Sequence, residues 1–366
     1  MVFPDHYSIT PVLHHSVSSE KKMADKVYTV AITGCGKRGK VHADYFHRNP
    51  RFQVVGVNDV DETRMEECAA LAGNPAKFDD TAKMLGELKP DVYCFCTPPT
   101  LRLPLIKLGV ENGAKLIAYE KPMATSMSEA IEIHELLNKS GVKSVLSHQR
   151  KYNIQFKRVK DIIDSGALGR IETVYAHCLG WMMHMTTHLA DYMRFFNNEE
   201  EVEWAEGLVH GREKLTDNHP SPDYMAGFLQ FKNGVRGVIE VGSLAPDVPE
   251  VEYWWRKVRI GAQGTEGFAE CFVGAGWRAC TKSRGFEEDL EEGTWDADHE
   301  QAPYIQDIAE WLDGTKVHPC NGEGAYKDQE IMMGLLRSAI QRKQIIFPLG
   351  PGEPELEALD RVIPAE

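Results

Sequence analysis

The chain has 366 residues, which is more than one hydrophobic core usually serves, so we expect two domains. Hydrophobic residues make up 42% of the sequence, enough to fill both cores. The formal net charge of -14 argues against a nucleic-acid partner, because binding to phosphates requires clustered Lys and Arg.

The eight cysteines include no CxxC pair, and a reducing compartment suits them, so we expect a cytoplasmic protein. No window has the roughly 18 consecutive apolar residues that a membrane span requires. Residues 1–25 mix charged and polar side chains instead of forming the core of a signal peptide, and we expect them to be a loose N-terminal extension.

From residue 27 onward, apolar runs alternate with helical patterns. This alternation predicts an α/β fold with a parallel sheet covered by helices on both faces, and we assign a dinucleotide-binding domain to residues 26–148. Strands are expected at 27–33, 52–58, near 77, 91–97, 116–120 and 143–147, with helices at 34–48, 62–72, 81–88, 101–112 and 128–140.

After residue 150 the pattern changes to longer β-type runs. We predict a second, α+β domain at residues 149–348, with a large, open and mainly antiparallel sheet, followed by a Pro-rich surface tail at 349–366. The strands are expected at 171–179, 203–211, 224–231, 235–241 and 253–260, and helices at 155–164, 304–312 and 325–342.

A glycine motif of the form GxGxxG lies between the first expected strand and helix. Its glycines allow a tight turn, close approach of the backbone to a pyrophosphate and close packing of the helix, whose N-terminal amides attract phosphates. An ordinary tight turn is the alternative. We predict a dinucleotide site formed by Gly34, Cys35, Gly36, Lys37, Arg38 and Gly39.

Asp59 lies 20 residues beyond Gly39, at the end of the second expected strand. An acidic group there can accept hydrogen bonds from both ribose hydroxyls of the adenosine, and it would repel a 2'-phosphate. We therefore predict NAD as the cofactor. Lys37 and Arg38 keep NADP as an alternative.

Two further expected strands end in residues that suit a cofactor crevice. In open α/β sheets ligands bind at the carboxyl edge, where Thr97-Pro98 and Glu120-Lys121 lie. We predict that these four residues line the nicotinamide and that the Lys121 side chain enters the same crevice.

Taken together, these motifs resemble the Gfo/Idh/MocA family, named for glucose-fructose oxidoreductase, inositol dehydrogenase and MocA. The resemblance runs from about residue 27 to residue 348 and implies a Rossmann domain, NAD or NADP, and a sugar, polyol or related substrate. By analogy it also implies a homodimer or homotetramer. Further matching features are His42, Gln149-Arg150-Lys151-Tyr152, the 164–169 segment DSGALG and His188-x-x-Asp191.

The resemblance makes Lys121 the lysine beside the reacting alcohol and His188 the histidine that handles its proton. Histidine titrates near neutrality, and a nearby ammonium stabilises a developing alkoxide. His184 stands where members usually carry Asp, and Arg102 stands where a His often follows the Thr-Pro element. We therefore count His184 with the catalytic residues and expect an altered proton path.

His184, His188 and Asp191 fall on one helix face, so Asp191 is a candidate to orient His188. Because no Glu or Cys completes a ligand set nearby, we predict no metal there. We further expect Lys151, Tyr152 and Trp181 to contact the substrate along with Lys121, His184, His188 and Asp191. Packing in the core is the alternative for Trp181 and Asp191.

These features predict an NAD(P)-dependent oxidoreductase that transfers hydride between nicotinamide and a secondary alcohol or ketone of a sugar, polyol or sugar derivative. Two alternatives remain open. One is an NAD-dependent glycosidase that oxidises a ring hydroxyl transiently, eliminates the aglycone and reduces the ring again. The other is a noncatalytic dinucleotide-binding regulator.

Overall fold

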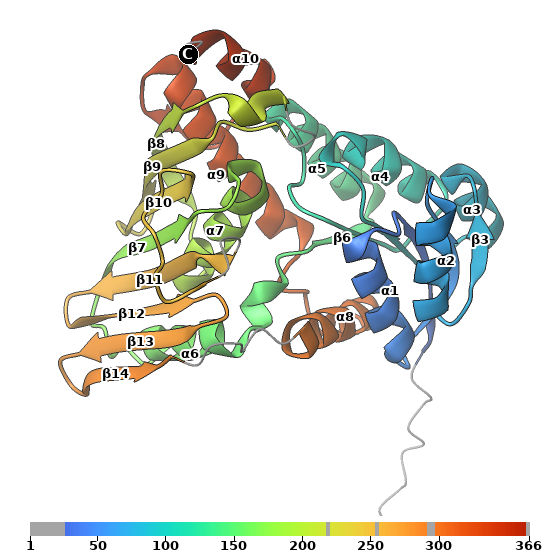
Figure 1. Ribbon diagram of the computed structural model, residues 1–366, viewed down its shortest axis with the longest axis horizontal. Coiled ribbons are helices and arrows are strands. Elements are labelled where there is room, and N and C mark those ends of the chain that lie inside the picture. The colour runs from blue at the N-terminus through green and yellow to red at the C-terminus, as the bar shows by residue number, and fades with distance from the viewer. Residues whose placement is uncertain (1–25, 217–219, 253–255, 291–296, 364–366) are drawn as a thin grey trace, which may run out of the picture.

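The computed structural model describes residues 26–216, 220–252, 256–290 and 297–363 (Figure 1). The expected extension at 1–25 and the start of the expected strand at 253–260 lie outside these ranges. Two sheets organise the described residues, one with six strands and one with nine. No helix among these residues has both the length and the apolar character needed to cross a membrane.

The six-stranded sheet is parallel, with the order β3-β2-β1-β4-β5-β6. This confirms the predicted Rossmann fold, and the crossover between β1 and β4 opens a crevice at the carboxyl edge. The strands are β1 (Tyr28–Thr33), β2 (Phe52–Asn58), β3 (Ala76–Phe78), β4 (Val92–Phe95), β5 (Leu116–Tyr119) and β6 (Lys143–Leu146). The helices between them are α1 (Lys37–Arg48), α2 (Glu62–Leu71), α3 (Thr81–Leu88), α4 (Arg102–Glu111) and α5 (Met127–Ser140), with a short 3-10 turn η1 (Pro99–Leu101) before α4.

Helices cover both faces of this sheet, which is why β4 and β5 consist entirely of buried residues. On one face the buried core includes α3, α4 and α5. On the other face α1 and α2 are joined by α8 (Ala297–Asp313), whose Tyr304, Ile305 and Ile308 share a core with Ile32 and Phe46. Figure 1 shows α8 beside α1, although most of the second sheet separates them in the chain.

The nine-stranded sheet has the order β14-β13-β12-β11-β7-β10-β9-β8-β15. Within the described residues β7 and β10 pair in parallel and the other neighbours are antiparallel, which confirms the predicted mainly antiparallel sheet. Its strands are β7 (Ile171–Cys178), β8 (Val202–His210), β9 (Tyr224–Phe231), β10 (Arg236–Gly242), β11 (Val258–Gly264), β12 (Gly267–Phe272), β13 (Gly276–Thr281), β14 (Gly285–Asp289) and β15 (Ile345–Ile346).

Helices from the same half of the chain join this sheet to the first. α7 (Met182–Phe196) packs on β7, β10 and β11, and α9 (Gly322–Gln341) packs on β8 while also contacting α5 and β6. α6 (Ile154–Asp164), preceded by the turn η2 (Gln149–Tyr152), packs on β12 and β13. Nearly every side chain of α7 is buried, so this helix lies in the core between the layers.

The C-terminal segment corrects one expectation. Instead of a surface tail, α10 (Glu355–Val362) packs against α9 (Figure 1), with Leu359 fully buried and Glu355 1% exposed. The buried side of this short helix consists of Glu355, Ala358 and Leu359, and Ile363 directly after it is buried too. Pro354 at the N-cap therefore begins a packed element rather than a loose extension.

Candidate active site

The glycine loop between β1 and α1 has the geometry of a dinucleotide cradle. Gly34 has a φ of +88°, and a Cβ built on it would lie 2.5 Å from the Cys96 carbonyl oxygen. A Cβ on Gly39 would collide with the Gly34 carbonyl, whereas one on Gly36 would meet no described atom within 4 Å. Gly36 therefore faces open space at the N-terminus of α1, where no side chain caps the helix and the amides are left for phosphates.

Asp59 lies at the end of β2 and supports this loop. Its carboxylate accepts hydrogen bonds from the backbone amide of Cys35, at 2.6 Å, and from that of Asp61, at 2.9 Å. The half-buried carboxylate is thereby held beside the glycine motif, as a ribose-binding group requires. The Cys35 side chain is fully buried beneath the loop, so this residue offers its backbone rather than its thiol.

Arg38, which the sequence left as a candidate for a 2'-phosphate, is directed elsewhere. Its Nε donates to Glu120 at 2.9 Å and an Nη lies 3.4 Å from Gln301. His42 also lies 3.3 Å from the same Glu120 oxygen. Burial alone would raise the pKa of Glu120, but Arg38, His42 and Lys121 outweigh it and hold this pKa well below its ordinary value. Glu120 therefore fixes Arg38 inside the structure, which favours NAD, while Lys37 is exposed.

Lys121 follows β5 directly, at the carboxyl edge of the sheet, and Thr97 and Pro98 follow β4 there. Burial lowers the pKa of Lys121 against the opposing effect of Glu120, and the charges of Arg38, Arg102 and Arg150 lower it further, to about 8. No ion pair of the Lys121 ammonium occurs among residues 26–216, 220–252, 256–290 and 297–363. Lys121 is thus a partly buried amine that can gain or lose a proton near neutral pH.

His188 lies on α7 with only 7% of its surface exposed. Its Nδ1 is 3.0 Å from the hydroxyl of Tyr192, one helical turn later. Burial lowers the pKa of His188 well below its ordinary value, and Lys121 and His148 lower it further, so the imidazole is neutral at pH 7. The effect of the Lys121 charge on this pKa places the residue after β5 within electrostatic range of the histidine on α7.

His184 lies one turn before His188, and its ring centroid is 5.3 Å from that of Trp181 in an edge-to-face contact. Trp181 caps α7 and lines a pocket of about 550 Å³ at the end of the second sheet. Lys214 also lines this pocket, with its ammonium 5.2 Å from the centre of the Trp181 ring. Pockets of this size accommodate small ligands, and Trp181 lines this one whereas Lys121, His184 and His188 do not.

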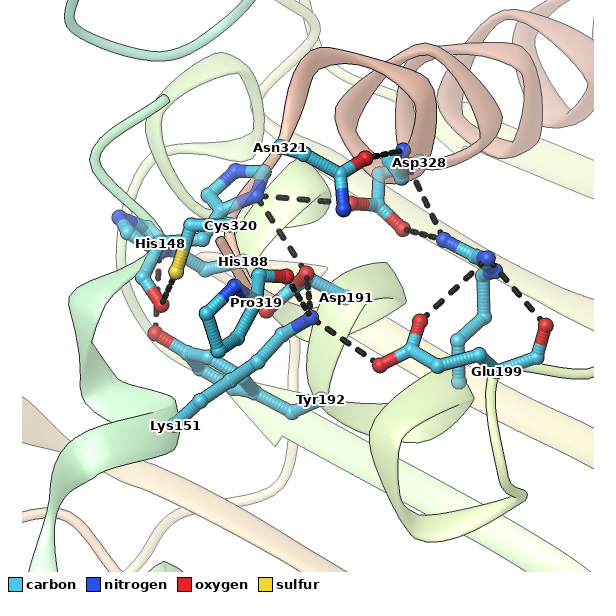
Figure 2. A network of polar contacts seen from close by, with 12 residues as sticks. His148, Lys151, His188, Asp191, Tyr192, Glu199, Pro319, Cys320, Asn321 and Asp328 are labelled. Atoms are coloured by element: carbon cyan, nitrogen blue, oxygen red, sulfur yellow. Dashed lines mark hydrogen bonds and ion pairs between the residues drawn. The ribbon is translucent and has the colours of Figure 1, made fainter. Parts of the chain in front are cut away.

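A network of buried charges lies behind His188 (Figure 2). The Lys151 ammonium is 2.8 Å from Asp191 and 3.1 Å from Glu199, and it donates to the Pro319 carbonyl at 3.2 Å. Arg194 is paired with Asp328 at 3.0 Å. Their charges converge from η2, α7 and α9.

His148 connects this network to the candidate site. Its Nδ1 lies 3.5 Å from Asp191 and 3.4 Å from Asp328, and its ring centroid is 5.2 Å from that of His188. Burial disfavours its protonation, but the two carboxylates outweigh burial and raise the pKa of His148 to about 9. The ligand atoms of these three residues are close enough to hold a metal, yet Lys151 already supplies a positive charge to Asp191.

The network corrects three sequence predictions. Lys151 and Tyr152 were expected to contact the substrate, but they are 4% and 7% exposed. Lys151 is held by Asp191, and the Tyr152 hydroxyl donates to Asp307 at 2.5 Å. Asp191 was expected to orient His188, but its carboxylate faces Lys151 and His148. The position of Lys151 and Tyr152 after β6 did not reveal that the turn η2 folds into the interior. Their polar groups are paired there because unpaired polar groups are costly in the interior.

Three residues near the site were not assigned by the sequence. Tyr192 takes the part foreseen for Asp191, since its hydroxyl is the partner of His188. Arg150 lowers the pKa of both Lys121 and His188, and His148 lowers that of His188. The spacing of His188 and Tyr192, four residues apart on one helix, was the available signal for Tyr192, and the motif around Arg150 was the signal for the other two.

Comparisons with known proteins agree with this geometry. Residues 28–148 match the model of an oxidoreductase family with an NAD-binding Rossmann fold, Gfo/Idh/MocA. The myo-inositol 2-dehydrogenase of Thermotoga maritima is 22% identical over 226 residues, which is 58% of this chain and 67% of the relative. The D-glucoside 3-dehydrogenase of Escherichia coli is 29% identical over 161 residues, which is 43% of this chain and less than half, 45%, of the relative.

Solved structures share the whole fold. A levoglucosan dehydrogenase in complex with NADH and levoglucosan superposes with a TM-score of 0.75 at 16% identity, covering 88% of this chain and 100% of the other. An oxidoreductase from Agrobacterium radiobacter in complex with NAD+, L-tartaric acid and magnesium gives a TM-score of 0.73 at 15% identity, covering 87% and 98%. At these identities the likeness establishes the fold.

The Rossmann sheet, the glycine cradle and Asp59 define the chain as a nicotinamide-dependent oxidoreductase with NAD as its cofactor. Residues 28–148 match the NAD-binding Rossmann model of the Gfo/Idh/MocA family, and inositol dehydrogenases are among the relatives that the chain resembles.

Proposed function

We propose that this protein is an NAD-dependent dehydrogenase for a secondary alcohol, or the corresponding ketone, in a sugar, polyol or sugar derivative. The observation that carries the proposal is the position of Lys121 at the carboxyl edge of the first sheet, beside the glycine cradle, with the buried His188 of α7 within range of its charge. Relatives that act on myo-inositol and on D-glucosides support this substrate class. The pocket beside Trp181 gives room for the part of the substrate that does not react.

The residues of the cradle would hold the cofactor, with Gly36 and the N-terminus of α1 at the pyrophosphate and Asp59 at the adenosine ribose. When bound, NAD accepts or supplies the hydride. Thr97 and Pro98 would form the wall beside the nicotinamide. Arg38 stays on Glu120 and takes no part in selecting a 2'-phosphate.

Oxidation of an alcohol carbon requires that its hydroxyl proton leave as the hydride departs. In the tautomer whose Nδ1 accepts from the Tyr192 hydroxyl, the neutral His188 can donate its Nε2–H to the alcohol oxygen and stabilise the developing alkoxide. The neutral amine of Lys121, with a pKa of about 8, takes the hydroxyl proton and later releases it to solvent. His184 and Trp181 lie one to two turns away on the side of the pocket and would contact the rest of the substrate.

The test is a screen of cyclitols, pyranosides and anhydrosugars with NAD+, followed by Lys121→Ala and His188→Ala variants. Each variant should lower turnover by about 100-fold or more, the scale of lost acid and base catalysis, and should leave the NADH Kd within about threefold. Lys107→Ala, on the surface of α4, is the matched control and should retain full turnover. If both site variants kept wild-type turnover, the assignment of the site would be wrong.

The pH profile tests the proton route. Because the neutral amine of Lys121 is the proton acceptor, kcat for alcohol oxidation should rise as the pH passes through about 8. Reduction of the ketone should fall over the same range. Release of an aglycone without net NADH would instead identify the transient-oxidation glycosidase, and cofactor binding without turnover across the panel would identify a regulator.

A further inference from the structure

Arg102 is one of the most deeply buried charged side chains of the molecule, with 1% of its surface exposed. It is the first residue of α4, and its guanidinium donates only to main-chain carbonyls and one hydroxyl. The carbonyl oxygens are those of Thr97 at 2.8 Å, Pro122 at 3.2 Å and Lys121 at 3.4 Å. The hydroxyl is that of Thr97, at 3.4 Å.

These contacts join the ends of two neighbouring strands. Thr97 follows β4, while Lys121 and Pro122 follow β5, and both strand ends line the predicted nicotinamide crevice. The planar, forked guanidinium can reach several carbonyls at once, which a lysine ammonium at the end of a flexible stem cannot reproduce. Arg102 therefore fixes the backbone from which the Lys121 side chain emerges.

Arg102 has no carboxylate within salt-bridge distance among the residues that the structure describes. A buried cation usually has an anionic partner because its desolvation is costly. The ring of Phe95 lies beneath the guanidinium, with 5.7 Å between the guanidinium carbon and the ring centre. The positive charge is thus left to act on its surroundings, which include Lys121, whose carbonyl oxygen lies 3.4 Å from the guanidinium.

Five charged or titratable groups face Lys121 from the elements around it. Glu120 precedes it on the same strand end and favours its protonation. Arg38 of α1, Arg102 of α4 and Arg150 of η2 disfavour it, and the neutral His188 of α7 lies opposite. Since Arg38 is paired with Glu120 at 2.9 Å, the charges of these two largely cancel at Lys121. Arg102 and Arg150 then remain as the positive charges without a paired carboxylate.

We propose that Arg102 is a positioning residue for Lys121: it fixes the two strand ends around the amine and places beside it a positive charge that favours the neutral, proton-accepting form. The importance of this role for catalysis rests on the proposed function. The role itself concerns the position and protonation of one amine and can be measured without a substrate.

The test is competitive labelling of the full-length protein with acetic anhydride between pH 6 and 11. Mass spectrometry of the Lys121 peptide gives the pH dependence of its reactivity, with the exposed Lys107 and Lys139 as internal references. In Arg102→Gln the amine should be more basic, so that Lys121 reactivity at pH 7.5 falls about tenfold, which corresponds to one pKa unit. Arg102→Lys keeps the charge and should keep this reactivity within about threefold. Because the ammonium cannot bond the carbonyls after both β4 and β5, NADH binding should weaken.

Arg51→Gln is the matched control, because Arg51 also bonds a main-chain carbonyl, that of Lys26 at 2.9 Å, but lies at the far end of the first sheet beside Asp313. Its Lys121 profile should equal that of the wild type. An unchanged profile in Arg102→Gln, or the same shift in Arg51→Gln, would overturn the proposal. If Arg102→Gln does not fold, Arg102→His, neutral above pH 7, should give the same change.

Labelling also separates this inference from the proposed function. A shifted Lys121 profile in a protein that oxidises no sugar or polyol would support the role of Arg102 and refute the dehydrogenase. Turnover that depends on Lys121 but not on Arg102 would support the dehydrogenase and refute the role of Arg102.

Discussion

The side chains around the reacting centre carry an unusual excess of positive charge for a protein with a net charge of -14. Lys121 is surrounded by Arg38, Arg102 and Arg150, and Glu120 is the one carboxylate that acts strongly on it. Burial keeps His188 neutral, and the charges of Lys121, His148 and Arg150 add to this effect. In the proposed site, an alkoxide that forms between Lys121 and His188 would therefore be stabilised by its surroundings, which is the usual way an active site lowers a barrier.

Asp59 should determine the choice between the two nicotinamide cofactors. In Asp59→Asn the loss of a charged hydrogen-bond acceptor should raise the NADH Kd about tenfold or more, and the preference for NADH over NADPH should shrink. Titration of both cofactors by fluorescence measures this. Asp61→Asn, at the N-cap of α2, is the control; because Asn caps a helix about as well as Asp, it should change neither stability nor the preference appreciably. An unchanged preference in Asp59→Asn would contradict the assignment.

Tyr192 should act through His188. Tyr192→Phe removes the hydroxyl that lies 3.0 Å from Nδ1, so the imidazole is no longer held in one orientation. We expect kcat to fall about tenfold or more with KM and the NADH Kd little changed. Steady-state kinetics with the substrate found in the screen give the answer. A proportional rise in KM with constant kcat would show that Tyr192 contacts the substrate instead.

At the scale of elements, the buried charge network ties the end of β6, η2, α7 and α9 together (Figure 2). α7 carries both His188 and Asp191, and His148 lies beside both, so the network fixes the helix that presents the histidine. Because the packed groups come from four elements, any one of them can shift only if a buried charge loses its partner.

Asp191 and Glu199 bind the same lysine and allow a matched comparison. Asp191→Ala leaves the Lys151 ammonium buried beside one exposed partner and should lower the free energy of unfolding by about 3 to 5 kcal/mol. Glu199 has a side chain that is 45% exposed, so Glu199→Gln should lower it by no more than about 1 kcal/mol. Urea unfolding measures both, and similar losses would show that the network is not the source of stability.

The raised pKa of His148 makes this stability depend on pH. The folded value of about 9 lies above the ordinary 6.5, so the native state retains a proton that the unfolded chain loses. The stabilisation is complete below pH 6.5 and is lost as the pH rises through 9, by about 3 kcal/mol in all.

The contribution of Lys121 to the pH dependence of stability has the opposite sign, because its folded pKa of about 8 lies below 10.5, and stability rises as the pH increases above 8. The effect of His148 is therefore measured without that of Lys121 between pH 6.5 and 8. Over this window the wild type should lose stability relative to His148→Gln in urea unfolding. Parallel curves for the two proteins would contradict a protonated His148.

How far the sequence predicts this molecule depends on the range of the interactions involved. Local patterns sufficed for the parallel sheet and the glycine cradle, because strand periodicity and a tight turn are set by neighbouring residues. The Lys151 side chain was misplaced because its partner Asp191 lies 40 positions away. The direction in which a turn folds depends on such distant charges, and no local pattern contains them.

The prediction of a surface tail at residues 349–366 was wrong for a related reason. The proline-rich surroundings of α10 are typical of a loose end, and only the groove beside α9 makes the burial of Leu359 favourable. His188 was found through a motif, whereas Tyr192 was not, although both lie on α7. The motif ends at Asp191, so it does not include the residue that contacts the histidine, Tyr192.

For the whole molecule, the last helix connects the two halves. The Glu355 carboxylate accepts from Arg337 of α9 at 2.8 Å and from the amide of Met127, at the start of α5, at 3.1 Å. Ser128 Oγ donates to the Gly352 carbonyl at 2.7 Å. The end of the chain thereby holds the first sheet's helix layer to the second sheet's helix layer.

Removal of this contact should weaken both halves together. Glu355→Ala leaves Arg337 without its carboxylate and should lower the free energy of unfolding by about 3 kcal/mol. Glu353→Ala, which breaks an ion pair with 52% of the glutamate side chain exposed, should change it by less than about 1 kcal/mol. Calorimetry that resolved separate transitions for the two halves in Glu355→Ala would confirm the connection, and an unchanged melting curve would refute it.

The position of α8 beside α1 has a consequence for biosynthesis. Ile32 and Phe46 share their core with Tyr304, Ile305 and Ile308 of α8, which begins about 150 residues after β6 ends. The face of the first sheet that carries α1 and α2 therefore stays partly uncovered until the ribosome has made α8. The nascent N-terminal half therefore emerges with an apolar surface that its own helices cannot close. Chaperones can bind this apolar surface during the interval, until α8 leaves the exit tunnel and covers it.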